Sequence, residues 1–302
     1  MLSRRGVLKG LAGLVLGATG FASYAFAIEP RWRLVVTDYG VSPTGWPADL
    51  PLTIAFVSDI HAGEPHMSLA RIADIVERTN ALGADLVLLG GDFVSSQRIV
   101  LQGYHAREWA PLLGRLKAPL GVYAVLGNHD WWHGPAPRLP ADGGRGIRDA
   151  LVAASIPVLE NDVVAFSHRG RRFWLAGLGD QLAHRRNGLV VGGVDDLAGT
   201  LAQITDDAPV ILLAHEPDIF LDEPAPRVSL TLSGHTHGGQ IRLFGYSPVV
   251  PSNYGKRLAY GHIVDGNRHL IVSGGLGTSI FPVRIGVPPE IVRIRLGGAA
   301  AT

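Results

Sequence analysis

Aspartate, asparagine and histidine side chains collect at the ends of five apolar segments of this 302-residue chain. Each segment is typical of a buried strand, and each is followed by polar residues that a protein core does not favour. Their side chains offer only oxygen and nitrogen donors, which are ligands that divalent metal ions accept. The five polar clusters are Ser58-Asp59-Ile60-His61, Gly90-Gly91-Asp92, Gly127-Asn128-His129-Asp130, His215 and Ser233-Gly234-His235-Thr236-His237.

Each cluster alone also has an ordinary structural explanation. An Asp-x-His pair is usually a capped turn beside a surface imidazole, and Gly-Asn-His-Asp is compatible with an Asx turn. A lone histidine such as His215 is more often hydrogen-bonded within a core. In α/β proteins, however, ligands bind where the carboxyl ends of strands meet. Five such clusters in succession therefore favour one common site over five unrelated turns.

The segments between these clusters predict a layered α/β architecture. Helical spacing is found over residues 68–82, with Ser68 as N-cap and Gly83 as C-cap, and over 105–116, 146–154 and 194–204. Residues 131–146 are rich in proline and glycine and predict a loop. Helices alternate with strands and strands then predominate, which indicates one core and two sheets. The predicted strands are 52–57, 85–89, 121–126, 163–166, 173–177, 209–214, 228–232, 269–273 and 291–296.

The order of the clusters resembles that of the calcineurin-like metallophosphoesterases. Asp-x-His, Gly-Asp, Gly-Asn-His-Asp, His and Gly-His-x-His follow one another between Ser58 and His237. The resemblance implies a four-layer α-β-β-α sandwich with a dinuclear metal site at the strand ends. Four later segments resemble the YkuE-like exported branch of the family: Gly238-Gly-Gln240, Tyr254-Gly-Lys256, Gly274-Gly-Leu-Gly277 and Pro288-Pro-Glu290.

The resemblance also implies a role for each site residue. One metal ion would be bound by Asp59, His61, Asp92 and His237, and the other by Asp92, Asn128, His215 and His235. Asp92 would bridge the two ions. His129 would lie near the leaving group as the catalytic residue, and Asp130 or Asp59 would support an imidazole from behind.

General chemistry agrees with these roles. Two divalent cations about 3.5–4 Å apart repel each other, so a bridging carboxylate and a bridging hydroxide are needed between them. The hydroxide would attack the phosphorus, and histidine is suited to protonate the departing alkoxide because its pKa lies near neutrality. Imidazole, carboxylate and amide ligands favour Mn, Fe, Zn or Co over Mg or Ca. The sequence does not choose among these four metals.

The N-terminal segment predicts export or membrane attachment. Ser3-Arg4-Arg5-Gly6-Val7-Leu8-Lys9 resembles a twin-arginine signal, and residues 11–28 carry no charge. Ala25-Phe26-Ala27 offers a cleavage site, but the apolar run also has about the minimum length of a membrane span. We therefore expect residues 1–30 to be a signal or anchor, and residues 31–302 a single metallophosphoesterase domain. The twin-arginine machinery is the expected export partner, and the location is periplasmic or membrane-associated.

Composition and one motif residue restrict the possible classes of substrate and partner. The net charge of +1 does not indicate a nucleic-acid partner, and the absence of cysteine excludes disulfides and zinc–thiolate sites. Asp130 stands where protein phosphatases of the family carry glutamate, which disfavours a phosphoprotein. The prediction is a small phosphodiester or pyrophosphate, or a lipid-linked phosphate.

Two alternatives remain at this stage. One is a UDP-2,3-diacylglucosamine hydrolase of lipid A synthesis, which would require an anchor whose domain faces the cytoplasm. The other is a non-catalytic metal-binding envelope protein, against which the complete ligand set and His129 count. Trp131, Trp132 and Phe281-Pro282 are candidates for an apolar wall of the substrate site, with simple loop packing as the alternative for the two tryptophans. Arg242, Lys256, Arg257 and Arg284 are candidates for contacts with phosphate, with ordinary solvated charge as the alternative.

Overall fold

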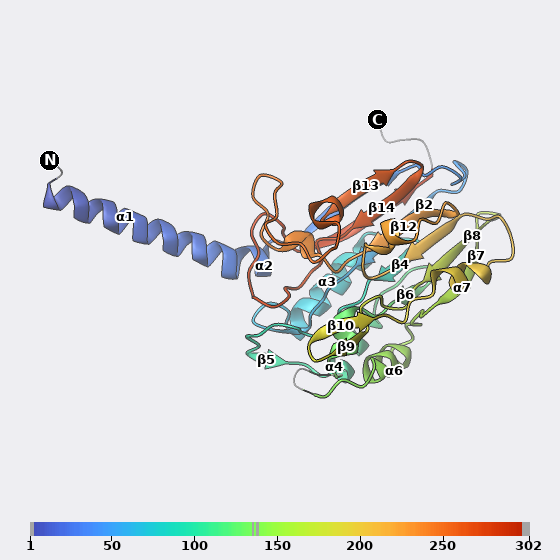
Figure 1. Ribbon diagram of the computed structural model, residues 1–302, viewed down its shortest axis with the longest axis horizontal. Helices are drawn as coiled ribbons and strands as arrows, with labels where there is room; N and C mark the ends of the chain where they lie inside the picture. Colours follow the sequence, from blue (N-terminus) through green and yellow to red (C-terminus); the bar gives the residue numbers. More distant parts are fainter. Residues whose placement is uncertain (1–2, 135, 137–138, 298–302) are drawn as a thin grey trace.

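Two mixed β-sheets pack face to face in the computed structural model, which describes residues 3–134, 136 and 139–297 (Figure 1). In the first sheet all neighbours are parallel except β15 and β2. Its strands, in spatial order, are β1 (Val35–Val41), β15 (Glu290–Leu296), β2 (Leu52–Val57), β4 (Leu86–Leu89) and β6 (Val122–Ala124).

The second sheet has a parallel centre and an antiparallel strand at each edge. Its strands, in spatial order, are β13 (Gly261–Asp265), β14 (Arg268–Val272), β12 (Val228–Ser233), β11 (Val210–Leu213), β8 (Arg171–Gly177) and β7 (Asp162–His168). Parallel strands place their carboxyl ends at the same edge of each sheet. In this protein those edges carry the site.

Side chains alternate between two cores because successive residues of a strand point to opposite faces. In β2, Ile54 and Phe56 enter the core between the two sheets, whereas Ala55 and Val57 enter the core beneath the helices. The helices that cover the first sheet are α3 (Leu69–Ala81), α4 (Ala106–Leu113) and α6 (Arg145–Ala153). The second sheet is covered by α7 (Leu197–Ala202) and α8 (Ile219–Asp222). The predicted four-layer α-β-β-α sandwich is confirmed.

Several predicted elements differ in length from the observed ones. The predicted strand 121–126 is only three residues long, and the chain then enters α5 (Asn128–Trp132), so Trp131 and Trp132 lie in a helix rather than in the predicted loop. Residues 135, 137 and 138 of that loop lie outside the described residues. Helix α7 begins later than predicted because the Asp196 side chain caps it through the N–H of Gly199.

Six further strands have no counterpart in the sequence prediction. β1 was missed because polar and apolar residues mix along it, and β13 because only alternate residues of it are shielded. Short two-stranded sheets are formed by β3 (Gly63–Glu64) with β5 (Gln102–Gly103), and by β9 (His184–Arg186) with β10 (Leu189–Gly192).

The N-terminal helix projects from one end of the domain (Figure 1). α1 (Arg4–Ser23) continues through a π-helical turn, η1 (Tyr24–Ile28), into α2 (Glu29–Trp32). The 29-residue segment is long and apolar enough to cross a membrane, and 6% of its most apolar window is buried. Its last turns do contact the domain, and Ala25 and Glu29 are buried there.

Candidate metal centre

All seven predicted metal ligands come together at the carboxyl ends of five strands. Asp59 and His61 follow β2, Asp92 follows β4, and Asn128 follows β6 and opens α5. His215 follows β11, and His235 and His237 follow β12. The site therefore draws on both sheets, and it lies where their central strands end.

The backbone adopts costly conformations at the ligand positions. A left-handed residue with a Cβ costs roughly 1–2 kcal/mol. Such strain in a native structure indicates that the surroundings hold the side chain in a functional direction. Positive φ angles are found at five of the seven predicted ligands: Asp59 (55°), His61 (47°), Asp92 (56°), His235 (67°) and His237 (51°).

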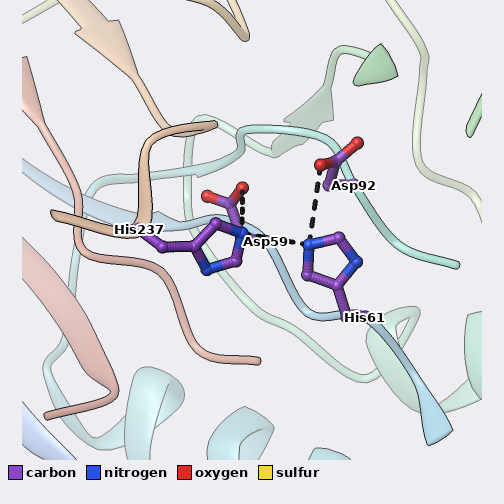
Figure 2. Close-up of side chains that lie close together, drawn as sticks. All are labelled: Asp59, His61, Asp92 and His237. Carbon is purple, nitrogen blue, oxygen red and sulfur yellow. Dashed lines mark hydrogen bonds and ion pairs between the residues drawn. The ribbon is translucent and has the colours of Figure 1, made fainter. Parts of the chain in front are cut away.

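Four buried side chains form the first group of donors (Figure 2). Nε2 of His61 lies 3.1 Å from Nε2 of His237 and 3.5 Å from Oδ2 of Asp92. Nε2 of His237 lies 3.4 Å from Oδ1 of Asp59. Because Nδ1 of His61 donates to the carbonyl of Val94 at 3.0 Å, its Nε2 presents a lone pair to the group. The donors converge as the ligands of one cation would.

A second group of donors also approaches Asp92. Nδ1 of His215 donates to the carbonyl of Gly90 at 2.6 Å, which directs its Nε2 toward Oδ2 of Asp92 at 3.3 Å. Nδ1 of His235 lies 2.9 Å from Oδ1 of Asn128. Glu216 adds a carboxylate to the cluster of His215 and His235. The Asp92 carboxylate thus contacts both groups, which is the position of a bridging ligand.

The donor set fits two divalent cations. Nε2 of His215 is buried, and its contact with Oδ2 of Asp92 at 3.3 Å lacks the geometry of a hydrogen bond, so this atom has no hydrogen-bond partner among the described residues. Burial lowers the pKa of His61 and His235, and lowers that of His237 well below its ordinary value. These rings are therefore neutral at pH 7, which is the form that binds a metal ion.

His215 differs from these neutral rings, because it interacts with the Asp92 carboxylate. Burial alone would lower the pKa of His215, but the Asp92 carboxylate raises it well above its ordinary value. Burial would likewise raise the pKa of Asp92, but the charge of His215 and its contact with the carboxylate hold that pKa well below its usual range. The pair carries a proton that a bound cation would replace.

Asp130 supports the backbone around the site rather than an imidazole. Its carboxylate accepts the N–H groups of Asp92 (2.8 Å), Phe93 (2.9 Å), Val94 (3.2 Å) and Gly127 (3.0 Å). Burial, together with the nearby Asp92, raises its pKa to about 7. The expectation that Asp130 steadies an imidazole is wrong, because both of its oxygens are used to join the turn after β4 to α5.

Asp59 also bonds to backbone, since its carboxylate accepts the N–H of His235 at 3.0 Å. It still takes part in the first group through its contact with His237.

His129 lies at the open side of the site. It is partly exposed, as is His235, whereas the other predicted ligands are buried. Its backbone N–H donates to Oδ1 of Asp92 at 2.9 Å, and its ring nitrogens lie 3.4 Å from Oγ of Ser279 and from Nε2 of His133. Burial holds its pKa well below the ordinary value, so the ring is neutral beside the donors. A phosphoryl anion next to the ring would favour its protonated form.

Two of the candidate phosphate-binding cations are engaged by other groups of the protein. Arg284 is fully buried, and its guanidinium donates to the carbonyls of Gly274 and Val287 and lies 3.2 Å from Nδ1 of His237. It therefore lies behind His237, a predicted ligand, and is not available to a substrate. Arg257 is paired with Asp265 at 3.3 Å.

The predicted aromatic wall is divided between the core and the site. Trp131 packs against the core beneath the helices. Trp132 lies with its ring edge against His129, 5.1 Å between centroids, and donates its indole N–H to the carbonyl of Leu182. Only Trp132 is therefore placed beside the proposed catalytic residue.

Three residues of the site were not predicted: Glu216, His133 and Ser279. Glu216 was recognisable as a carboxylate directly after His215. Ser279 carries no sequence signal, because its approach to His129 joins segments that are 150 residues apart.

Comparison with known proteins gives a consistent result. Residues 52–239 match the calcineurin-like phosphoesterase family model. The chain is 31% identical to the uncharacterized metallophosphoesterase YkuE of Bacillus subtilis (strain 168), over 96% of each chain. It is 29% identical to phosphodiesterase YaeI of Escherichia coli (strain K12), over 98% of this chain and all of that one. Among solved structures, NAD nucleotidase (NadN) of Haemophilus influenzae aligns with a TM-score of 0.47 and 17% identity, over 75% of this chain and 46% of that chain.

Proposed function

This chain belongs to the calcineurin-like phosphoesterase family and is a hydrolase of phosphoester bonds, and we propose that its substrate is a phosphodiester or a pyrophosphate. The observation that supports a dinuclear mechanism best is the position of Asp92. Its Oδ2 lies 3.5 Å from Nε2 of His61 and 3.3 Å from Nε2 of His215, so one carboxylate serves both groups of donors.

In this proposal Asp59, His61, Asp92 and His237 hold one divalent cation, and Asp92, Asn128, His215 and His235 hold the other. The bound cations supply a water nucleophile at neutral pH and neutralise the charge of the phosphoryl oxygens. The metals are drawn from Mn, Fe, Zn and Co, since four histidine nitrogens accompany two carboxylates and one amide in the ligand set.

Side chains of the protein position the metal ligands and deliver a proton in this proposal. Asp130 holds the turn that carries Asp92 against α5, which carries Asn128 and His129. Arg284 holds the ring of His237. Protonated His129, at the open side, delivers its proton to the departing alkoxide, which leaves as the alcohol. With His235 it lines the side from which substrate reaches the site.

A diester or pyrophosphate is preferred to a monoester because a relative that aligns over the whole of its own length is named a phosphodiesterase. The apolar N-terminal helix is the observation behind the proposal of a membrane-associated protein with a lipid-linked substrate. The arginine pair that precedes it is the observation behind the proposal of export by the twin-arginine machinery. Replacing Arg4 and Arg5 together by lysine should retain the protein in the cytoplasm. Unchanged delivery in cell fractions would argue against that route.

The activity is tested with the full-length protein in detergent, freed of metal and reloaded with Mn²⁺. The substrates are bis-p-nitrophenyl phosphate, p-nitrophenyl phosphate and a nucleotide-sugar pyrophosphate. We expect metal-dependent turnover that is higher for the diester or the pyrophosphate than for the monoester. Absence of turnover with all three substrates, for Mn²⁺, Fe²⁺, Zn²⁺ and Co²⁺ alike, would refute the proposal.

A further inference from the structure

Large apolar side chains are exposed on three loops near the open side of the metal centre. Leu101 is 74% exposed, Val249 72%, and Phe244 fully. Contiguous exposed apolar side chains mark an interaction surface. We call this the three-loop surface, and its members are Ile99 and Leu101 in loop 96–103, Leu243, Phe244, Tyr246 and Val249 in loop 240–250, and Ile280 and Phe281 in loop 278–287.

Hydrogen bonds join the three loops into one surface. The N–H of Arg98 donates to the carbonyl of Ile280 at 2.9 Å. Loop 240–250 is joined to the same loop 278–287 through Arg242 N–H to the carbonyl of Ile285 (2.7 Å), and Ile285 N–H to the carbonyl of Gln240 (2.9 Å). Loop 278–287 is therefore the centre of the surface.

The N-terminal helix is attached to the same central loop. The N–H of Arg284 donates to the carbonyl of Ala25 at 3.0 Å, and the N–H of Val287 donates to Oε1 of the buried Glu29 at 2.8 Å. From this attachment α1 projects away from the domain (Figure 1). The segment that contains the predicted cleavage site is thus part of the folded domain, and the attached helix is of membrane-spanning length.

Basic and aromatic groups flank the apolar side chains. The guanidinium of Arg98 lies over the ring of Phe281 at 5.5 Å, and Nζ of Lys256 lies over the ring of Tyr246 at 6.0 Å. Aromatic rings and basic side chains that extend along apolar surface are typical of the interface between a bilayer and water. Positive charge there is attracted to anionic headgroups.

We propose that the three-loop surface lies in the headgroup region of the bilayer that α1 enters. The metal centre then opens toward the membrane, because Ser279, which contacts His129, directly precedes Ile280. The chemical class of substrate follows as an amphipathic lipid whose phosphoester lies at headgroup depth. This statement about substrate rests on the proposed function, whereas the statement about the surface does not.

The surface is tested by fluorescence quenching, without any measurement of activity. The chain has no cysteine, so Phe244→Cys and Val152→Cys each provide a single position for an environment-sensitive dye. Val152 is also exposed, at 57%, but lies on α6 outside the surface. The full-length variants are reconstituted in vesicles of phosphatidylcholine and phosphatidylglycerol, with and without nitroxide-labelled lipid.

We expect quenching at position 244 to be at least about twofold stronger than at position 152, since interfacial apolar groups lie ~5–10 Å deep. Equal quenching at the two positions, or none at position 244, would overturn the proposal.

The substrate class is tested in the same vesicles with phosphatidyl-p-nitrophenol, a chromogenic phosphodiester. Phe244→Ser is expected to lower turnover of this lipid several-fold relative to Val152→Ser, and to leave turnover of soluble bis-p-nitrophenyl phosphate unchanged. Equal turnover of the lipid by both variants would contradict access from the membrane. If the parent chain hydrolyses neither substrate, the proposed function fails. The quenching result still shows whether the three-loop surface lies in the bilayer.

Discussion

Asp92 is the residue on which the dinuclear interpretation depends most. Replacing it by asparagine removes the negative charge that both groups of donors share. We expect Asp92→Asn to bind fewer than two metal ions per chain and to lose more activity than the ~10–100-fold that follows loss of an outer-shell partner. Metal content by mass spectrometry and the rate with bis-p-nitrophenyl phosphate measure both effects.

Asp74→Asn, on the surface of α3, is the matched control for that experiment. If Asp92→Asn keeps two metal ions and full activity, Asp92 is not the bridge.

His129 is expected to act on the leaving group and not on the metals. His129→Ala should keep its metal content, and should lose about 10²–10⁴-fold in rate with a poor leaving group but much less with p-nitrophenolate. His262→Ala, on β13, provides the comparison. Loss of metal in His129→Ala, or an equal loss of rate for all leaving groups, would contradict the proton-donor role.

The seven predicted ligands could be found from the sequence because polar donors follow five apolar strands in succession, although each cluster alone is ambiguous. The residues that support them could not be found in this way. Asp130 is bonded to N–H groups 36–38 residues earlier in the chain, as well as to its own turn. Arg284 resembles a solvent-exposed cation in a glycine-rich loop, and only the folded loops supply the carbonyls that bury it.

At the scale of elements, close approach of strand ends requires glycine at particular positions. A Cβ at Gly234 would lie 2.0 Å from Oγ of Ser58 and 2.3 Å from Oδ2 of Asp59. Gly234→Ala should therefore lower the melting temperature, for a cost of about 1–3 kcal/mol, and weaken metal binding. A Cβ at Gly40 in β1 would meet no atom within 4 Å, so Gly40→Ala should change neither property. Equal melting temperatures for the two variants would show that the turn after β12 tolerates a side chain.

The attachment of the N-terminal segment is expected to weaken in acid. His66 is buried, and its Nε2 donates to the carbonyl of Phe26 at 2.7 Å. Burial lowers the pKa of His66 below 6.5, with Arg71, Arg31 and Arg284 acting in the same direction. The folded state therefore binds this proton less readily than the unfolded chain, and stability falls as the pH drops below 6.5.

Hydrogen exchange of residues 24–30 should accordingly rise between pH 7 and pH 5. His66→Gln keeps an N–H donor but does not titrate, so its exchange should respond less to pH once the intrinsic rate is corrected. An identical pH response in the two proteins would exclude His66 as the cause.

The strands with uniform apolar character were predictable, and the remaining elements were not. β2, β4, β11 and β12 are buried along nearly their whole length, so each appears in the sequence as an apolar run. β1 joins the sheet through β15, which lies about 250 residues further along the chain, and its alternating exposure leaves only a weak pattern.

At the scale of the whole molecule, the predicted ligands are spread over residues 59 to 237 because they follow strands of both sheets. Each sheet contributes parallel strands whose carboxyl ends meet over the core between them. The four-layer order was implied by family resemblance, whereas the sequence pattern alone indicated only two sheets and one core. The docking of residues 25–29 against loop 278–287 was not predictable, because the segment has the composition of an ordinary export signal.

The most direct test of a dinuclear phosphoesterase is a metal titration of the metal-free, full-length chain that follows bis-p-nitrophenyl phosphate hydrolysis and bound metal together. The rate should rise until two Mn²⁺, Fe²⁺, Zn²⁺ or Co²⁺ ions are bound per chain and then remain constant, and a chelator should abolish it. A maximum rate at one ion per chain, or two bound ions without hydrolysis of this substrate or of any other phosphoester tested, would contradict the account.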